Sequence, residues 1–221
     1  MTRSMNRILG VAGAVLLITL LAIGIGAHPD VRVSAASCSV SGVISTDTTW
    51  SPTTCDPYIV TASVVVPSGV TLTIEAGTTV KFDSLKGLLV QGTLVARGTA
   101  SNAITFTSNQ ATPAKGDWGN IHFMDSSTDA TFDGSGNYAG GSIVQYAIIE
   151  YAGYVGVGTA IGALTIEASS PYIDHNTIRN NRASGIYASA SGALRVTNNT
   201  ITGNTVGNPS YPSNGGGISA G

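Results

Sequence analysis

A group of charged side chains in the second half of the chain has the residue types for chemistry on a sugar: Glu150, Asp174, His175, Arg179 and Arg182. Carboxylates can hold calcium, but this ion takes many oxygen ligands, so Glu150 and Asp174 can share one only if the fold brings them together. Glu150 and Arg179 each directly follow an isoleucine. The shared phase predicts a surface ion pair between them, which we favour over catalysis. Glu150, Asp174 and Arg179 remain the catalytic candidates.

A second set of carboxylates lies in one Gly-, Ser- and Thr-rich stretch: Asp117, Asp125, Asp129 and Asp133. A glycosidase needs two carboxyl groups facing one cleft, and these residues are concentrated enough to supply them. In such surroundings, however, Asp usually accepts hydrogen bonds from its own turn, and we favour that interpretation. The alternative interpretation is a stabilising calcium site formed by Asp125, Asp129 and Asp133. Apart from this possible calcium ion, we expect no cofactor.

Aromatic side chains offer a route to sugar binding: Trp118, Tyr146, Tyr151, Tyr154, Tyr172 and Tyr187. Exposed aromatic rings on a rigid face can stack on sugar rings. We expect Trp118 and Tyr146 to be core or cap residues, and we take Tyr151, Tyr154 and Tyr187, with His175, as the glycan-contact candidates. A catalytic triad has no support, because His122 and His175 lie far apart without a Ser or Cys nucleophile in a recognisable turn.

A repeat defines the elements that position these side chains. Residues 173–181 (Ile-Asp-His-Asn-Thr-Ile-Arg-Asn-Asn) resemble residues 196–204 (Val-Thr-Asn-Asn-Thr-Ile-Thr-Gly-Asn), 23 positions later. A fixed period of this length predicts a solenoid of stacked coils. We expect Ile178 to stack on Ile201 with a spacing of about 4.8 Å. The same register stacks Asn176 on Asn199, so that amide hydrogen bonds can run along the axis.

The rest of the chain reads as short β-strands. Val70, Leu72 and Ile74 alternate with polar residues, which is the period of a strand with one buried face. No apolar 3.6-residue period occurs after the N-terminal segment, so the fold class is all-β. A β-sandwich shows similar strands, but it has no reason to repeat one phrase at one phase, so we favour the solenoid.

Composition limits the possible partners. The 221 residues include 43% apolar and only 10% charged side chains, with a net charge of −2. Nucleic acid binding would require clustered Lys and Arg, and disorder would require low hydrophobicity with high charge. We therefore expect a folded protein with no nucleic-acid partner.

The N-terminus has the pattern of an export signal. Arg3 and Arg7 precede an apolar stretch over residues 8–27, which we expect to be helical and which is followed by small residues. We expect cleavage after Ala35 or Ala36. The alternative is an uncleaved anchor, and only in that case do we expect the chain to contact a membrane. Residues 1–36 are thus a signal peptide or anchor, and the remainder lies outside the cytoplasm.

Cys38 and Cys55 are the only cysteines, and export makes a disulfide between them the expected state. The alternative is a lipid-modified Cys38. We expect residues 37–57 to form an N-terminal cap and residues 58–221 to form the coils. No polar cap follows the last coil, so we expect the solenoid to be truncated at its C-terminal end.

Five phrases together carry a family resemblance: residues 69–82, 92–99, 103–108, 116–121 and 149–153. The set resembles secreted bacterial proteins of the pectate-lyase-like superfamily, from about residue 44 onward. The resemblance implies a right-handed parallel β-helix. Members include polysaccharide lyases and hydrolases, which use Asp or Glu clusters that bind calcium with an Arg or Lys as base, and also adhesins. The phrases are turns and core strands, so they imply nothing about activity.

We therefore expect a secreted or cell-surface β-helix module with a structural, adhesive or glycan-contacting role and no identifiable catalytic centre. Its expected partner is a polysaccharide or cell-surface glycan. The alternative is a polysaccharide lyase or glycoside hydrolase whose active coils are partly missing from this chain, so we leave enzymatic activity open while leaning against it.

Overall fold

The computed structural model describes residues 35–153, 162–189, 192–205 and 216–221. The chain divides into two compact units, residues 1–33 and 34–221, and every described residue belongs to the second. The expected export helix and Tyr154 lie outside the described residues. In the part that is described, there is no helix long and apolar enough to cross a membrane.

The second unit is a parallel β-helix with three walls, which we call A, B and C. Wall A consists of the first part of β3 (Tyr58–Val66) with β5 (Thr79–Phe82), β8 (Ile104–Ser108), β13 (Ala147–Glu150), β16 (Thr177–Arg179) and β19 (Thr200–Thr202). Wall B consists of the last part of β3 with β6 (Leu88–Val90), β9 (Ile121–Phe123), β14 (Gly162–Glu167), β17 (Ser184–Ser189) and β20 (Ile218–Ala220). Wall C consists of β2 (Thr48–Trp50), β4 (Thr71–Ile74), β7 (Thr93–Arg97), β12 (Ile143–Gln145), β15 (Tyr172–Asp174) and β18 (Arg195–Thr197).

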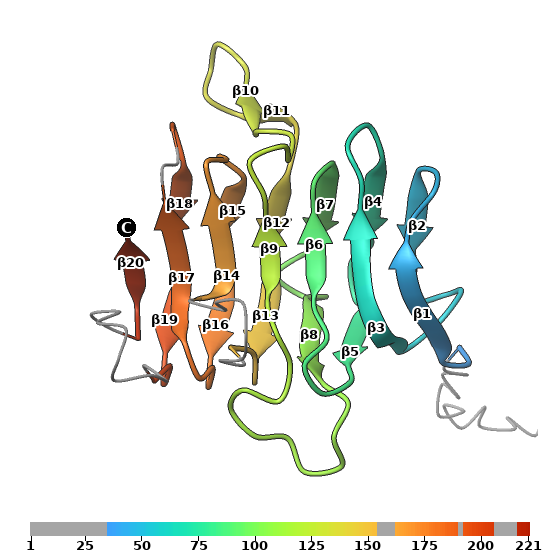
Figure 1. The fold of residues 1–221 in the computed structure, drawn as a ribbon. Coiled ribbons are helices and arrows are strands. Elements are labelled where there is room, and N and C mark those ends of the chain that lie inside the picture. Colours follow the sequence, from blue (N-terminus) through green and yellow to red (C-terminus); the bar gives the residue numbers. More distant parts are fainter. Residues whose placement is uncertain (1–34, 154–161, 190–191, 206–215) are drawn as a thin grey trace, which may run out of the picture. The chain divides into compact units, whose positions relative to one another are not determined.

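Two features depart from this plan. Strand β1 (Cys38–Val43) pairs with β3, which bends from wall A into wall B and joins them in one sheet. Strands β10 (Thr131–Phe132) and β11 (Tyr138–Gly140) form an antiparallel hairpin between walls B and C. The hairpin projects from the solenoid beside wall C (Figure 1).

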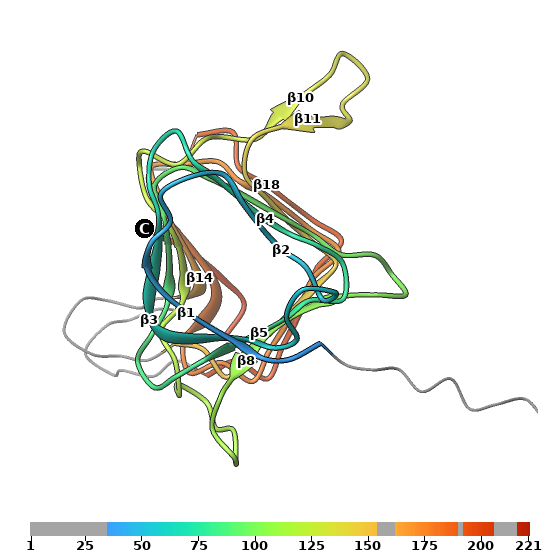
Figure 2. The ribbon, with the colours of Figure 1, turned by 90° about the vertical axis from the view of Figure 1, so that its right-hand side faces the viewer.

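The handedness follows from the path of the chain. Viewed from the N-terminal end, the chain passes from β1 to β2 to β3 in a clockwise direction while it moves away from the viewer (Figure 2). The solenoid is therefore right-handed, as the sequence resemblance implied.

The predicted vertical neighbours are confirmed. Ile178 pairs with Ile201 between β16 and β19, and Ile173 pairs with Val196 between β15 and β18. The interpretation as a β-sandwich is wrong, because the strands of each wall are parallel and belong to successive coils.

Inward side chains form columns along the axis. One column on wall A runs through Tyr58, Val80, Phe106, Ile149, Ile178 and Ile201. All but the last are buried in the core, and each coil covers the apolar face of its neighbours. On wall B, Ile121 and Phe123 are fully buried and His122 points outward, as the period-two pattern predicts.

At the corner between walls C and A, each coil has one residue with positive φ: Tyr146, His175 and Asn198. Asn176 and Asn199 directly follow the last two of these and form a ladder. Asn176 Nδ2 donates to Asn199 Oδ1 at 2.9 Å, and Asn176 Oδ1 accepts from the Ala147 amide at 2.8 Å. This confirms the predicted stack. Asn181 and Asn204 form a second ladder at the corner between walls A and B, with an Nδ2 to Oδ1 distance of 2.9 Å. The sequence reading did not identify this second ladder.

The predicted disulfide joins Cys38 at the start of β1 to Cys55, with a Cα–Cα distance of 5.6 Å. It connects the first coil to the turn that follows β2. The sulfur of Cys38 is therefore occupied, which contradicts the alternative of a lipid-modified Cys38.

Candidate functional site

The charged group predicted from the sequence is divided between two walls. Glu150 and Arg179 face outward on wall A, where Arg179 Nε donates to Glu150 Oε2 at 2.9 Å. The Thr107 hydroxyl donates to the other oxygen of Glu150 at 3.2 Å. Asp174 and His175 lie instead at the end of wall C. The ion pair is confirmed, and the third catalytic candidate, Asp174, lies on a different wall.

The acidic stretch forms the predicted turn at Asp133, whereas Asp129 contacts a residue 41 positions away. The Asp133 carboxylate accepts from the amides of Ser135 and Asn137, both at 2.9 Å, and these hydrogen bonds hold its pKa below the usual value despite some opposing desolvation. Asp129 accepts from the Ser170 amide at 2.6 Å. Asp125 is exposed. Within the described ranges, no three His, Cys, Asp or Glu side chains gather where they could hold a metal ion.

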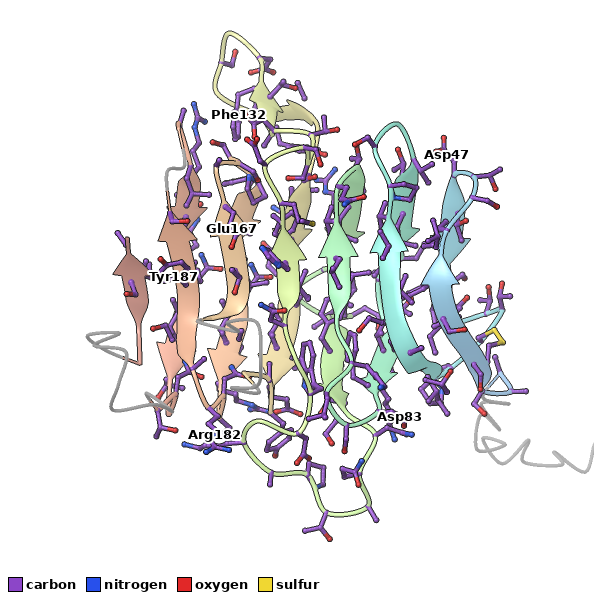
Figure 3. All side chains as sticks on the ribbon, viewed as in Figure 1. Asp47, Asp83, Phe132, Glu167, Arg182 and Tyr187 are labelled. Atoms are coloured by element: carbon purple, nitrogen blue, oxygen red, sulfur yellow. A yellow bond between two sulfur atoms is a disulfide. The ribbon has the colours of Figure 1, made fainter. Side chains whose placement is uncertain are left out.

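The aromatic candidates have different environments. Trp118 is fully buried and stacks on Phe82 with ring centroids 4.1 Å apart, which confirms it as a core residue. Tyr151 is half-buried at the corner between walls A and B, with φ of 64°. Tyr187 is half-buried on the outer face of wall B (Figure 3). His175 is exposed at the corner between walls C and A.

The densest polar network lies on the outer face of wall C. Successive strands align one outward side chain each: Arg97, Gln145, Asp174 and Thr197. Arg97 Nε donates to Gln145 Oε1 at 3.2 Å, and Gln145 Nε2 donates to Asp174 Oδ2 at 2.8 Å. We call this set the wall C column.

Asp174 is the centre of this network. Its side chain is almost fully buried and accepts hydrogen bonds from Gln145, His175, Thr197 and Asn198 at distances from 2.7 to 3.0 Å. Burial raises the pKa of a carboxylate, but these bonds favour the charged form more strongly and lower the pKa of Asp174 to about 2. The carboxylate is therefore charged and its oxygens are occupied by protein donors.

Asp174 also orients His175. The Nδ1 atom of His175 lies 2.7 Å from Asp174 Oδ2, and since the carboxylate can only accept, Nδ1 carries the proton. The ring stacks on Tyr146, one coil away, with centroids 4.7 Å apart. The result is an aromatic corner next to the wall C column, where His175 is exposed and Tyr146, which we expected to be a core or cap residue, is half-buried.

The β10–β11 hairpin borders the opposite side of the column. Phe132 and Tyr138 pack against Tyr172, with ring centroids 5.2 and 6.4 Å away. Arg195 lies over Phe132 at 3.6 Å, and Arg97 lies over Tyr138 at 5.3 Å. Burial raises the pKa of Tyr138, against the opposing charge of Arg97. Figure 3 shows Phe132 on this hairpin.

Wall B carries a second polar pair. His122 Nε2 lies 3.2 Å from Glu167 Oε2, and Glu167 is 44% exposed. The pair lies within ion-pair distance but does not meet the geometry of a hydrogen bond, so Nε2 has no hydrogen-bond partner among the described residues. The polar contacts of the wall C column, by contrast, all have hydrogen-bonding geometry.

We call the wall C column, the aromatic corner and the hairpin aromatics together the wall C site. Sequence reasoning found part of it. Asp174, His175, Tyr146 and Tyr172 were noted as charged or aromatic residues. Another set was missed: Arg97, Phe132, Tyr138, Gln145, Arg195, Thr197 and Asn198. Thr197 and Asn198 occupy the same phase of the repeat as Asp174 and His175, and this signal could have identified them. The hairpin residues carry no repeat signal.

The fold and this site define the class of protein: a right-handed parallel β-helix with a polar and aromatic outer wall. A family model described as a pectate-lyase-like β-helix domain matches residues 42–160, which is more than half of the chain. The chain belongs to this family. No curated protein and no solved structure matches it.

Proposed function

We propose that this protein is an extracytoplasmic β-helix module that contacts glycans through the outer face of wall C. One observation carries the proposal: a continuous polar column, fixed by Asp174, lies between the hairpin aromatics and the Tyr146–His175 corner, where His175 is exposed. Sugar-binding sites combine ring faces with fixed polar groups.

Rigidity favours recognition. The column lies on paired strands rather than on loops, so its side chains lose little conformational freedom when a ligand binds. The site residues and the core columns belong to the same coils. A ligand would therefore meet a preformed surface.

Two observations support a location outside the cytoplasm. The Cys38–Cys55 disulfide suits an oxidising compartment, and the basic and apolar N-terminus has the pattern of an export signal. A fusion of the full chain to a periplasm-dependent reporter enzyme tests this placement. A fusion that accumulates in the cell without reporter activity would contradict it.

The glycan test uses the full chain and immobilised neutral and acidic polysaccharides, with retention measured by affinity electrophoresis. His175→Ala removes an exposed contact and should reduce retention, whereas Tyr187→Ala on wall B serves as the matched control and should not. Assays for reducing ends and unsaturated sugars, with and without calcium, run in parallel. Absence of retention on every glycan would contradict the proposal, and product formation would favour the lyase or hydrolase alternative.

A further inference from the structure

We infer that the wall C site takes a linear, uncharged glycan that lies along the solenoid axis, and that the β10–β11 hairpin excludes side branches on one edge. This inference rests on the proposed function and adds the substrate class. Three independent features of the site carry it.

The first feature is spacing. The wall C column places one polar side chain on each of β7, β12, β15 and β18, and adjacent strands lie about 4.8 Å apart. An extended chain of 1,4-linked pyranoses advances by a comparable distance per sugar. A linear glycan along the axis therefore meets one strand per sugar. On β15 the contact comes from the exposed His175 next to the buried Asp174, so contacts accumulate over these four strands.

The second feature is the type of hydrogen-bonding atom left open. Asp174 is occupied by four protein donors. Among the described contacts, His175 Nε2 and Asn198 Oδ1 have no partner, while Arg97 uses only Nε. Asn198 Oδ1 is an acceptor and the Arg97 guanidinium is a donor. Hydroxyl groups satisfy both kinds, whereas a carboxylate group cannot donate to the Asn198 acceptor. The face therefore suits a polyhydroxyl ligand.

The third feature is the hairpin. Ile143 pairs with Tyr172, and the two belong to the column next to the wall C column. Because Val144 faces the core, its neighbour Ile143 faces outward, yet Ile143 is fully buried. The hairpin packs here: its aromatic residues lie against Tyr172, and Arg195 Nη1 donates to the carbonyl of Gly136 at 3.3 Å. This edge is closed to substituents, and the corner at Tyr146 and His175 is the open edge.

The test uses the full chain and three sets of 1,4-linked oligosaccharides in calorimetric titrations. They are linear manno-oligosaccharides of increasing length, the same backbone carrying galactose branches, and oligogalacturonates as the charged comparison. We expect Kd to fall about tenfold from the disaccharide to the tetrasaccharide and then to level off. Branched chains should bind about tenfold more weakly than linear chains of equal length.

Two variants connect the result to the residues. Phe132→Ala combined with Arg195→Ala removes the contacts that hold the hairpin and should reduce the discrimination against branches, with linear chains still bound. Tyr187→Ala is the control and should leave all three series unchanged. Circular dichroism verifies that each variant is folded.

The possible outcomes separate the two proposals. If oligogalacturonates bind more tightly than neutral chains, if affinity does not depend on length, or if branched and linear chains bind equally, the inference is overturned while the proposed function stands. If no glycan binds in this series or in the wider polysaccharide panel, both are overturned.

Discussion

Asn176 and Asn199 occupy the same position in consecutive coils, and the Nδ2 atom of Asn176 donates to the Oδ1 atom of Asn199 at 2.9 Å. The link is more than a side-chain contact. Asn176 also accepts from the Ala147 amide and donates to the Val144 carbonyl, both at 2.8 Å. A single buried amide thus satisfies backbone groups at a corner where the strand pairing of wall C ends.

Replacing Asn176 with Ala should lower the free energy of unfolding by about 3 kcal/mol, because it leaves buried backbone groups without partners. Urea titration followed by circular dichroism measures the change. Asn199→Ala is the matched control, and since Asn199 is only half-buried, its loss should be smaller. Equal effects for the two variants would contradict the role of burial in the ladder.

The depressed pKa of Asp174 predicts a pH dependence of stability. Its pKa falls from 3.8 to about 2 in the folded state, so it stabilises the fold above pH 4, and this contribution is lost as the pH falls through about 2. Asp174→Asn should therefore cost about 2 kcal/mol at pH 7.

Unfolding of wild type and Asp174→Asn at pH 7 and pH 2.5 measures the effect. The difference between the two proteins should shrink at the lower pH. Asp133→Asn is the control, because the Asp133 carboxylate is also hydrogen-bonded but is fully exposed, and its effect on stability should be smaller. A difference for Asp174→Asn that is constant with pH would refute the assignment.

The disulfide should stabilise the N-terminal coil mainly by restricting the unfolded chain. Cys38 and Cys55 are 17 positions apart, and a loop of this size is worth about 3 kcal/mol. Thermal unfolding with and without reductant measures the loss, and the Cys38→Ser/Cys55→Ser variant should match the reduced wild type. If the reductant also destabilises that variant, the effect has another source.

Trp118→Ala should be among the most destabilising single changes. The ring is fully buried against Phe82, and the indole N–H donates to the Glu150 carbonyl at 2.8 Å. We expect a loss of about 3 to 5 kcal/mol. Arg179→Ala removes only a partly exposed ion pair and should cost about 0 to 1 kcal/mol. Chemical denaturation compares the two, and similar losses would contradict the assignment of Trp118 to the core.

The solenoid was predictable because its information is local and repeated. Ile173 and Ile178 recur as Val196 and Ile201 at one phase, and the coil spacing then requires them to be vertical neighbours. The Glu150–Arg179 pair followed from the same reasoning, whereas the Cys38–Cys55 bond followed from the presence of only two cysteines behind an export signal. The second asparagine ladder, at Asn181 and Asn204, was visible in the same repeat but was not recognised.

The candidate site was less predictable. Asp174 and Glu150 are similar residues in sequence terms, yet one is buried among four donors on wall C and the other faces outward on wall A. Asp174 ends its strand just before the corner between the walls, whereas Glu150 lies beyond that corner at the far end of a wall A strand. Periodicity assigns a side chain to the inside or the outside of a coil, but it does not assign it to a wall.

From the residue pattern alone follow the coiled β-architecture and its inward columns, because both depend on spacing along the chain. The disulfide follows as well, because the chain has only two cysteines. The placement of Phe132 and Tyr138 against Tyr172, and of Arg97 beside Gln145, depends on where an irregular hairpin folds back. Such contacts join residues from different coils without a repeated signal. They exist only once the coils are stacked, and for that reason the wall C surface emerges from the three-dimensional fold.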